Sequence, residues 1–262
     1  MNKDEINKTI ELYSSGIGTN EIAEILGFHR SSIQYNLKKQ GIKLRHRSPG
    51  NKYNVFYFDN YTEENCYWAG FIYADGNVRK DGCSVNIHLS SVDLEALEFI
   101  AKATKYNGNI EKCKDGSVRI YFTGKWFPNA LKENYGIGPN KSKDGRIPKN
   151  LDKKSFKHFI RGLFDGDGCI TISTVPTINF TLNKEDCYYL SKYFYNNLDV
   201  KLKQKHKYAK IMDKGSYGQI HYSGKNAKKI LDWMYSESTE ETRLRRKYEL
   251  YKKLWLQRLG EK

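Results

Sequence analysis

The stretch FIRGLFDGDGCI, residues 159–170, places two carboxylates among three glycines, directly after an apolar run. Asp165 and Asp167 therefore fall at the end of a predicted helix. The C-terminus of a helix carries a partial negative charge, which disfavours further anions there. Either this is an ordinary Asp-Gly turn, or a positively charged group lies against the carboxylates.

The same stretch occurs a second time, as YWAGFIYADGNV at residues 67–78. Asp75 matches Asp167 at an offset of 92. Two further blocks repeat in the same order, at offsets of 93 and 100: residues 85–97 with 178–190, and residues 120–135 with 220–235. Because the order is kept and insertions fall only between blocks, the chain contains an internal duplication.

Each copy is predicted to run helix, strand, strand, helix, strand, strand, helix. In the strands, apolar residues such as Val85 and Ile87 alternate with polar ones such as Asn86 and His88. We expect an α+β fold with helices on the apolar face of each antiparallel sheet and a polar, basic opposite face. An ordinary half-solvated sheet alternates in the same way, so a nucleic-acid-reading face is indicated only in combination with charge.

The charge of the chain is strongly positive. The formal net charge is +15, the pI is near 9.4, and 14% of the residues are aromatic. This composition favours a nucleic-acid partner over a membrane, with a solvated lysine-rich surface as the alternative. Six lysines lie close together around one acid, Asp213: Lys201, Lys203, Lys205, Lys207, Lys210 and Lys214.

Residues 1–44 are predicted to form three short helices that resemble a helix-turn-helix. Thr19 or Asn20 would cap the second helix, Gly27 would make the turn, and Leu37 would do the packing usual at Asn36. The third helix would lie in a DNA major groove, although a small bundle that binds protein shows the same pattern. Its DNA-facing residues would be Arg30, Ser31, Gln34, Tyr35 and Lys38.

Composition also sets the expected domain boundaries. The basic stretch RHRSPGNKYN has no periodicity and is typical of a linker. The expected segments are a helix-turn-helix domain (1–44), a basic linker (45–62), a first unit (63–140), an inter-unit linker (141–154), a second unit (155–238) and a C-terminal basic helix (239–262).

The remaining composition favours a cytoplasmic protein. The N-terminus has no apolar signal core, and no apolar run reaches the ~18–20 residues of a membrane span. Five scattered cysteines contain no C-x-x-C pair, so neither a disulfide framework nor a structural zinc site is predicted from spacing. We expect them to be small core residues.

The motif copies WAGFIYADG and IRGLFDGDG resemble those of single-chain LAGLIDADG homing endonucleases, and the resemblance covers about residues 63–238. It implies two pseudo-symmetric αββαββα units with saddle-shaped sheets in one monomer. It also implies a site-specific double-strand DNA endonuclease that leaves short 3′ overhangs. Two further readings of the scaffold stay open: a transcription regulator that does not cut, and a maturase that binds intron RNA.

The motif residues suit this chemistry. Small residues four positions apart, Gly70 and Ala74 in one copy and Gly162 and Gly166 in the other, let two helices approach closely. Asp75 and Asp167 would then lie side by side and repel each other, and Mg²⁺ (or Mn²⁺) would remove the conflict. Asp165 matches Tyr73 in the first copy, which favours a structural role for it.

Further site residues follow from the resemblance. Lys125 and Lys225 each follow a glycine at a strand-to-helix turn, and in the family a lysine at this position stabilises charge near the scissile phosphate. The sheets would read the flanking major groove. The candidate DNA-binding residues are Arg79, Ser84, Asn86, His88, Arg119, Tyr121, Thr171, Ser173, Asn179, Thr181, Lys203, Lys205, Gln219 and His221.

Overall fold

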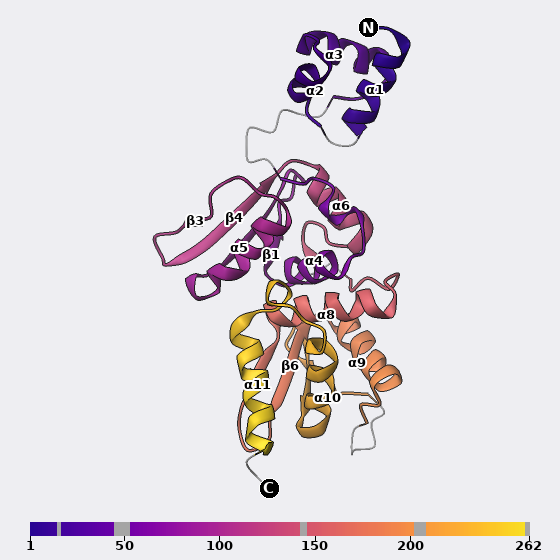
Figure 1. Ribbon diagram of the computed structural model, residues 1–262. Helices are drawn as coiled ribbons and strands as arrows, with labels where there is room; N and C mark the ends of the chain where they lie inside the picture. Colours follow the sequence, from indigo (N-terminus) through magenta and orange to yellow (C-terminus); the bar gives the residue numbers. More distant parts are fainter. Residues whose placement is uncertain (15–16, 45–52, 142–145, 202–207, 260–262) are drawn as a thin grey trace. The chain divides into compact units, whose positions relative to one another are not determined.

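The chain divides into two compact units, Met1–Pro49 and Gly50–Lys262. The structure is a computed structural model (Figure 1), and it describes residues 1–14, 17–44, 53–141, 146–201 and 208–259. Within these ranges, each helix is too short or too polar to cross a membrane.

The N-terminal unit, Met1–Pro49, consists of three helices around a small apolar core. Gly27 adopts a left-handed conformation (φ +69°), and its N–H bonds to Ala23 O, which makes the predicted turn. Leu37 is fully buried, whereas the Asn36 side chain bonds back to Ser32 O at 2.8 Å, so Leu37 does take the packing position. The helices are α1 (Lys3–Ser14), α2 (Thr19–Leu26) and α3 (Arg30–Lys39).

The cap of α2 differs from the expectation. The helix begins at Thr19, and its N-cap residue is Gly18, which offers no side-chain oxygen. Neither Thr19 nor Asn20 therefore caps this helix. Glycine is accepted at an N-cap because its backbone adopts the required extended geometry without strain.

The C-terminal unit, Gly50–Lys262, contains the duplicated order of elements (Figure 1). The first half comprises α4 (Glu63–Asp75), β1 (Gly76–Val78), β2 (Ser84–Ser90), α5 (Leu94–Ala103), β3 (Glu111–Lys112), β4 (Ser117–Thr123) and α6 (Trp126–Tyr135). The second half comprises α8 (Lys153–Asp167), β5 (Cys169–Thr171), β6 (Thr177–Leu182), α9 (Lys184–Leu198), β7 (Met212–Asp213), β8 (Gly218–Ser223) and α10 (Gly224–Tyr235).

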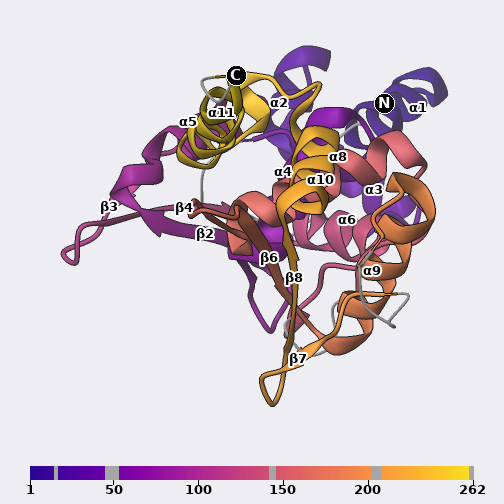
Figure 2. The same cartoon turned by 90° about the horizontal axis from the view of Figure 1, so that it is seen from below.

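Each half contains a four-stranded antiparallel sheet, in the orders β1-β2-β4-β3 and β5-β6-β8-β7. Side chains alternate along the strands: Val118, Ile120 and Phe122 are buried, while Arg119 and Tyr121 are half-buried on the other face. In Figure 2, α5 lies on one side of β2 and β4 and leaves the opposite side uncovered. The expected α+β fold of two such sheets after three N-terminal helices is confirmed.

Part of the stretch expected as a linker belongs to the core. The short 3₁₀ helix η1 (Tyr57–Asp59) packs against α6, and Phe58 is fully buried. The Tyr53 hydroxyl donates to Thr123 O at 2.8 Å. These aromatic residues give the segment an apolar surface that the sheet and α6 cover. Residues 45–52 lie outside the described part.

The C-terminal segment connects the two halves. It contains η3 (Glu240–Thr242) and α11 (Arg245–Leu259), and Leu244 between them is buried. Arg246 Nε donates to both carboxylate oxygens of Asp93, at 2.9 and 3.1 Å. Asp93 ends η2 (Ser91–Asp93) in the first half, so α11 lies against both copies of the repeat.

Candidate active site and nucleic-acid interface

The two motif helices, α4 and α8, meet backbone to backbone. A Cβ atom added to Gly70 would lie 1.9 Å from Phe159 O, and one added to Gly162 would lie 1.9 Å from Tyr67 O. No side chain fits at either crossing. The predicted small-residue spacing therefore produces a contact that only glycine permits.

Asp75 and Asp167 are the last residues of these helices. A Cβ atom on Gly166, next to Asp167, would lie 2.3 Å from the Ala74 Cβ and 3.2 Å from Asp75 Oδ2. Asp75 is half-buried, and Asp167 keeps more of its surface in contact with water. The structure thus brings the two carboxylates predicted as catalytic to the same end of the seam.

Both carboxylates are held where negative charge is unfavourable. Partial withdrawal from water raises the pKa of Asp75 to about 6, and repulsion from Asp167 adds to the effect. Withdrawal from water also raises the pKa of Asp167, while Lys141 and Lys247 oppose that rise. A pair of anions at two helix C-termini favours the approach of a cation.

Two lysines bind the ends of the motif helices. The Lys141 ammonium donates to Tyr73 O and to Ala74 O, the latter at 2.5 Å. Burial lowers the pKa of Lys141, and the negative charges of Asp167 and Asp75 partly offset this. The ammonium therefore lies at the carbonyl end of α4, beside the carboxylate pair.

Lys247 of α11 has the corresponding place at α8. Its ammonium donates to Phe164 O at 2.7 Å, Gly166 O at 3.0 Å and Gly168 O at 2.5 Å. The side chain is only 3% exposed. Burial lowers the pKa of Lys247 to about 8, although Asp165 and the carboxylate pair favour its charged form.

These are not the lysines expected at the site. Ile120 of β4 pairs with Ile87, which pairs with Gly76 directly after Asp75. Thr123 lies three residues, about 10 Å, farther along β4, and Lys125 lies beyond it. Lys225 has the equivalent place after β8, and both side chains are exposed. The register of the sheets therefore carries Lys125 and Lys225 away from the carboxylates.

A sequence signal for Lys141 and Lys247 exists. Their separation, 247 − 141 = 106, continues the rising offsets of the repeated blocks, which are 92, 93 and 100. The two lysines thus occupy corresponding places after the third block of each copy. The segments around them share too few other residues for the match to stand out.

Asp165 is a buried structural acid. Its carboxylate accepts from the Tyr67 hydroxyl at 3.1 Å, the Tyr235 hydroxyl at 2.5 Å and Leu244 N at 2.8 Å. The last bond fixes the chain three residues before Lys247. The structural role expected for Asp165 therefore extends to positioning the segment that delivers this lysine.

The sheet residues predicted to contact DNA lie mainly on the uncovered faces. Arg119 pairs with Glu111 at 2.8 Å and lies over the Tyr121 ring, and Gln219 donates to Thr181 Oγ1 at 2.9 Å. Ser84 is buried, at 8% exposure. The half-buried or exposed strand residues are Asn86, His88, Arg119, Tyr121, Thr171, Asn179, Thr181, Gln219 and His221.

Four other candidates lie outside the strands or the described residues. Arg79 is in the turn after β1, where it pairs with Asp81 at 3.1 Å. Ser173 lies in the turn after β5, where its hydroxyl donates to Val175 O at 2.9 Å. Lys203 and Lys205 fall outside the described residues.

In the N-terminal unit, α3 presents a polar face. Ile33 and Leu37 are fully buried, and Tyr35 is 63% exposed. The residues expected to face DNA are half-buried or exposed: Arg30, Ser31, Gln34, Tyr35 and Lys38.

Comparison with known proteins gives similarity of structure and none of sequence. No family model and no curated protein matches this chain. The structure is similar to that of the I-LtrWI LAGLIDADG homing endonuclease bound to target DNA (TM-score 0.50, 14% identity, 77% of this chain and 92% of that one). It is also similar to meganuclease I-SmaMI bound to uncleaveable DNA (TM-score 0.51, 13% identity, 74% and 91%).

A third similar structure is full-length DUF199/WhiA from Thermatoga maritima (TM-score 0.48, 17% identity, 78% of this chain and 64% of that one). At these identities a likeness concerns the fold and not the activity. The match covers nearly the whole length of the two endonuclease chains. They show that the chain has the LAGLIDADG fold.

Proposed function

We propose that the chain is a site-specific double-strand DNA endonuclease that hydrolyses phosphodiester bonds with a divalent cation. The observation that carries the proposal is the meeting of Asp75 and Asp167 at one end of the seam, with one lysine from the segment that follows each copy beside them. Two half-sites in one chain allow both strands to be cut by a monomer. The two endonucleases of this fold, whose structures contain bound DNA, support the choice of substrate.

The carboxylates fit Mg²⁺ or Mn²⁺. Their ligand atoms are hard oxygens, and the raised pKa of Asp75, caused by burial and by Asp167, supports a cation at this place. Asp75 and Asp167 would hold the ion. When bound, it would polarise the phosphate, lower the pKa of a bound water and stabilise the leaving oxygen.

Lys141 and Lys247 would preorganise this site. Lys141 and Lys247 engage carbonyl groups of α4 and α8, which holds the two Asp-bearing helix ends in place. Their positive charges also lie in a poorly hydrated site, where they stabilise charge that develops on the phosphate oxygens. We assign to them the role that the resemblance gave to Lys125 and Lys225.

The surrounding surfaces supply affinity and sequence recognition. The uncovered sheet faces carry hydrogen-bonding side chains such as Asn86, Gln219 and His221, which suit base edges in a major groove. The N-terminal unit would lengthen the target site by placing α3 in a further groove. We expect short 3′ overhangs, because two active sites at one seam would cut the strands across the minor groove.

The test is cleavage of DNA that spans the insertion site of the protein's own gene, with Mg²⁺ or Mn²⁺. We expect linear product from the wild type and a loss of at least about a hundredfold in Asp167→Asn with DNA binding retained. Binding without cleavage by the wild type would favour a regulator. Undiminished cleavage by Asp167→Asn would place the chemistry elsewhere, and stimulation of splicing without cleavage would favour a maturase.

A further inference from the structure

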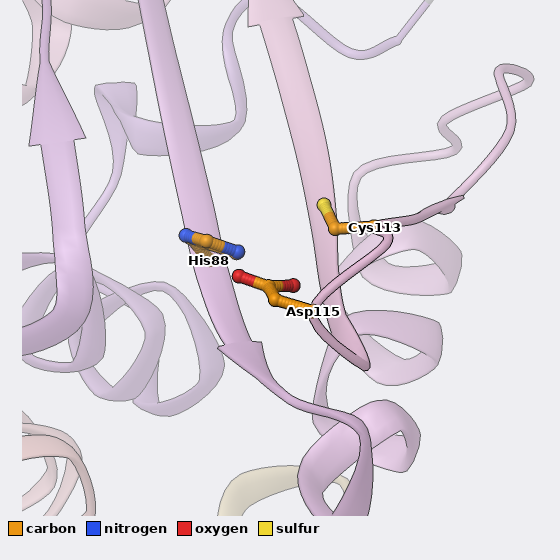
Figure 3. A group of neighbouring side chains, drawn as sticks. All are labelled: His88, Cys113 and Asp115. Atoms are coloured by element: carbon orange, nitrogen blue, oxygen red, sulfur yellow. The ribbon is translucent and has the colours of Figure 1, made fainter.

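Three side chains with different ligand atoms gather on the first sheet, and none of them belongs to the carboxylate pair (Figure 3). His88 lies on β2, and Cys113 and Asp115 lie in the turn between β3 and β4. One imidazole nitrogen, the Cys113 Sγ and one Asp115 carboxylate oxygen all lie within 4.8 Å of one another. Small side-chain rotations would bring the three atoms to the separations of a shared coordination shell.

The turn holds Cys113 and Asp115 in place. Cys113 N donates to Ser117 O at 2.8 Å, and Gly116 N donates to Cys113 O at 3.1 Å. Gly116 has φ +81°, which favours glycine, and Ser117 N donates to Asp115 Oδ1 at 3.0 Å. The backbone that carries two of the three ligand atoms is thus fixed by its own hydrogen bonds, which lowers the entropy lost when a ligand binds.

Ser117 marks the point where these groups converge. Its hydroxyl donates to Asp115 Oδ1 at 2.5 Å and lies 2.5 Å from His88 Nε2, from which it accepts. A cation between the imidazole and the carboxylate would replace this hydroxyl bridge. The His88 proton would then move to Nδ1, the Cys113 thiol would lose its proton to solvent, and the Ser117 hydroxyl would turn toward water.

We propose that His88, Cys113 and Asp115 form a binding site for Zn²⁺. Imidazole nitrogen, thiolate sulfur and carboxylate oxygen are the three ligand types that zinc accepts, whereas Mg²⁺ requires oxygen ligands. Three protein ligands leave a fourth position for water. The nearby Arg119 charge is compensated by Glu111 at 2.8 Å, so a cation beside it is less strongly repelled.

The bound ion would fasten the β3–β4 turn to β2. The turn otherwise reaches His88 through the Ser117 hydroxyl, and β3 has only two residues paired with β4. His88 lies directly opposite Arg119 on the side of the sheet that we propose contacts DNA. The site itself shares no residue with the carboxylate pair, so it stands independently of the endonuclease proposal.

The test is a Co²⁺ titration of the full chain, metal-free and reduced, followed by absorption. We expect one equivalent of Co²⁺ to produce a thiolate-to-cobalt band in the near ultraviolet, and Zn²⁺ to displace it. Oxygen ligands at Asp75 and Asp167 cannot produce this band. Cys113→Ser should abolish the band, and His88→Ala and Asp115→Asn should weaken Co²⁺ binding at least tenfold.

Cys83→Ser is the matched control, because Cys83 is another half-buried cysteine and lies in the turn directly before β2. It should keep the band, as should Asp167→Asn. Ser117→Ala removes only the competing hydroxyl and should keep or strengthen binding. Circular dichroism checks that each variant is folded. Absence of the band in the folded wild type at saturating Co²⁺, or an unchanged band in folded Cys113→Ser, would overturn the proposal.

Discussion

At the level of single residues, Asp75 and Asp167 end two helices whose carbonyl groups already direct negative charge toward them. Lys141 and Lys247 compensate part of that charge by binding the carbonyls themselves. Lys247 is buried and Lys141 is half-buried, so each ammonium acts through a medium that screens less than bulk water. Burial and repulsion from Asp167 still raise the pKa of Asp75, so negative charge at this place stays unfavourable.

Asp75→Asn should stabilise the metal-free protein at neutral pH. The folded-state pKa of about 6 lies above the unfolded value of 3.8, so the folded state binds protons more tightly and loses stability as pH rises between these values. The amide removes this penalty, worth ~1–2 kcal/mol after screening. Chemical unfolding in EDTA should show the gain at pH 7.5 and none at pH 3.5.

A control for this prediction is Asp213→Asn. Lys184 lowers the pKa of Asp213, so its charge favours the folded state and the amide should give no gain at pH 7.5. Equal stabilisation by both substitutions would contradict the account of Asp75.

Removal of either Lys141 or Lys247 should impair cleavage. Lys141→Met and Lys247→Met should each lower the single-turnover cleavage rate by about a hundredfold or more, because a preorganised charge at the phosphate is lost. Lys125→Met and Lys225→Met, which change exposed lysines, should keep the rate within a few-fold. A loss confined to the second pair would restore the sequence-based assignment.

At the level of elements, the seam between α4 and α8 decides where the functional groups lie. The close approach at Gly70 and Gly162 leaves no room for side chains, and it sets the carboxylates at the ends of the helices in register. N-caps fix where each helix begins: Thr62 accepts from Asn65 N, and Asp152 accepts from Lys154 N and Ser155 N. β1 then begins directly after Asp75, and β5 begins two residues after Asp167.

Gly162→Ala should open this seam. Its methyl group would lie 1.9 Å from the backbone carbonyl of Tyr67, which cannot move without shifting α4. We expect the free energy of unfolding to fall by at least ~3 kcal/mol, and cleavage to fall with it. Gly138→Ala is the matched control, since its methyl group would meet only the Lys132 side chain at 3.9 Å. Similar unfolding curves for the two variants would contradict the close packing.

At the level of the whole molecule, the chain combines two bodies with separate cores. Tyr13, Ile22, Ile33 and Leu37 form one core in Met1–Pro49, and the duplicated body has its own. Because each part has its own core, we expect the two parts to fold separately.

A chain that begins at Gly50 should therefore fold and still cut. Its affinity for target DNA should fall at least tenfold, because the contacts of α3 are lost. The plot of log affinity against log salt should also become less steep by about 0.9 for each phosphate contact removed. An unchanged affinity and slope would show that the N-terminal unit does not bind the target.

Sequence patterns alone were enough to predict the duplicated αββαββα order, the alternation of the strands, the three N-terminal helices and the glycines of the seam. These are local or repeated patterns, in which the period of the apolar residues and the size of a side chain act directly on the backbone. The sequence also singled out Asp75 and Asp167, because they follow such a pattern at matching places. Asp165 could be distinguished from them because the matching position in the first copy is Tyr73.

Which lysine ammonium groups reach the carboxylates, and which metal-binding side chains lie together, depends on the three-dimensional packing. Lys141, Lys247 and Asp93 come from segments whose local sequence says little about where they dock. The same holds for His88 and Cys113, which spacing alone did not connect because His88 lies on β2 and Cys113 in the turn between β3 and β4. Such groups come together through sheet register and through the packing of α11, and these depend on the whole core rather than on any one stretch of chain.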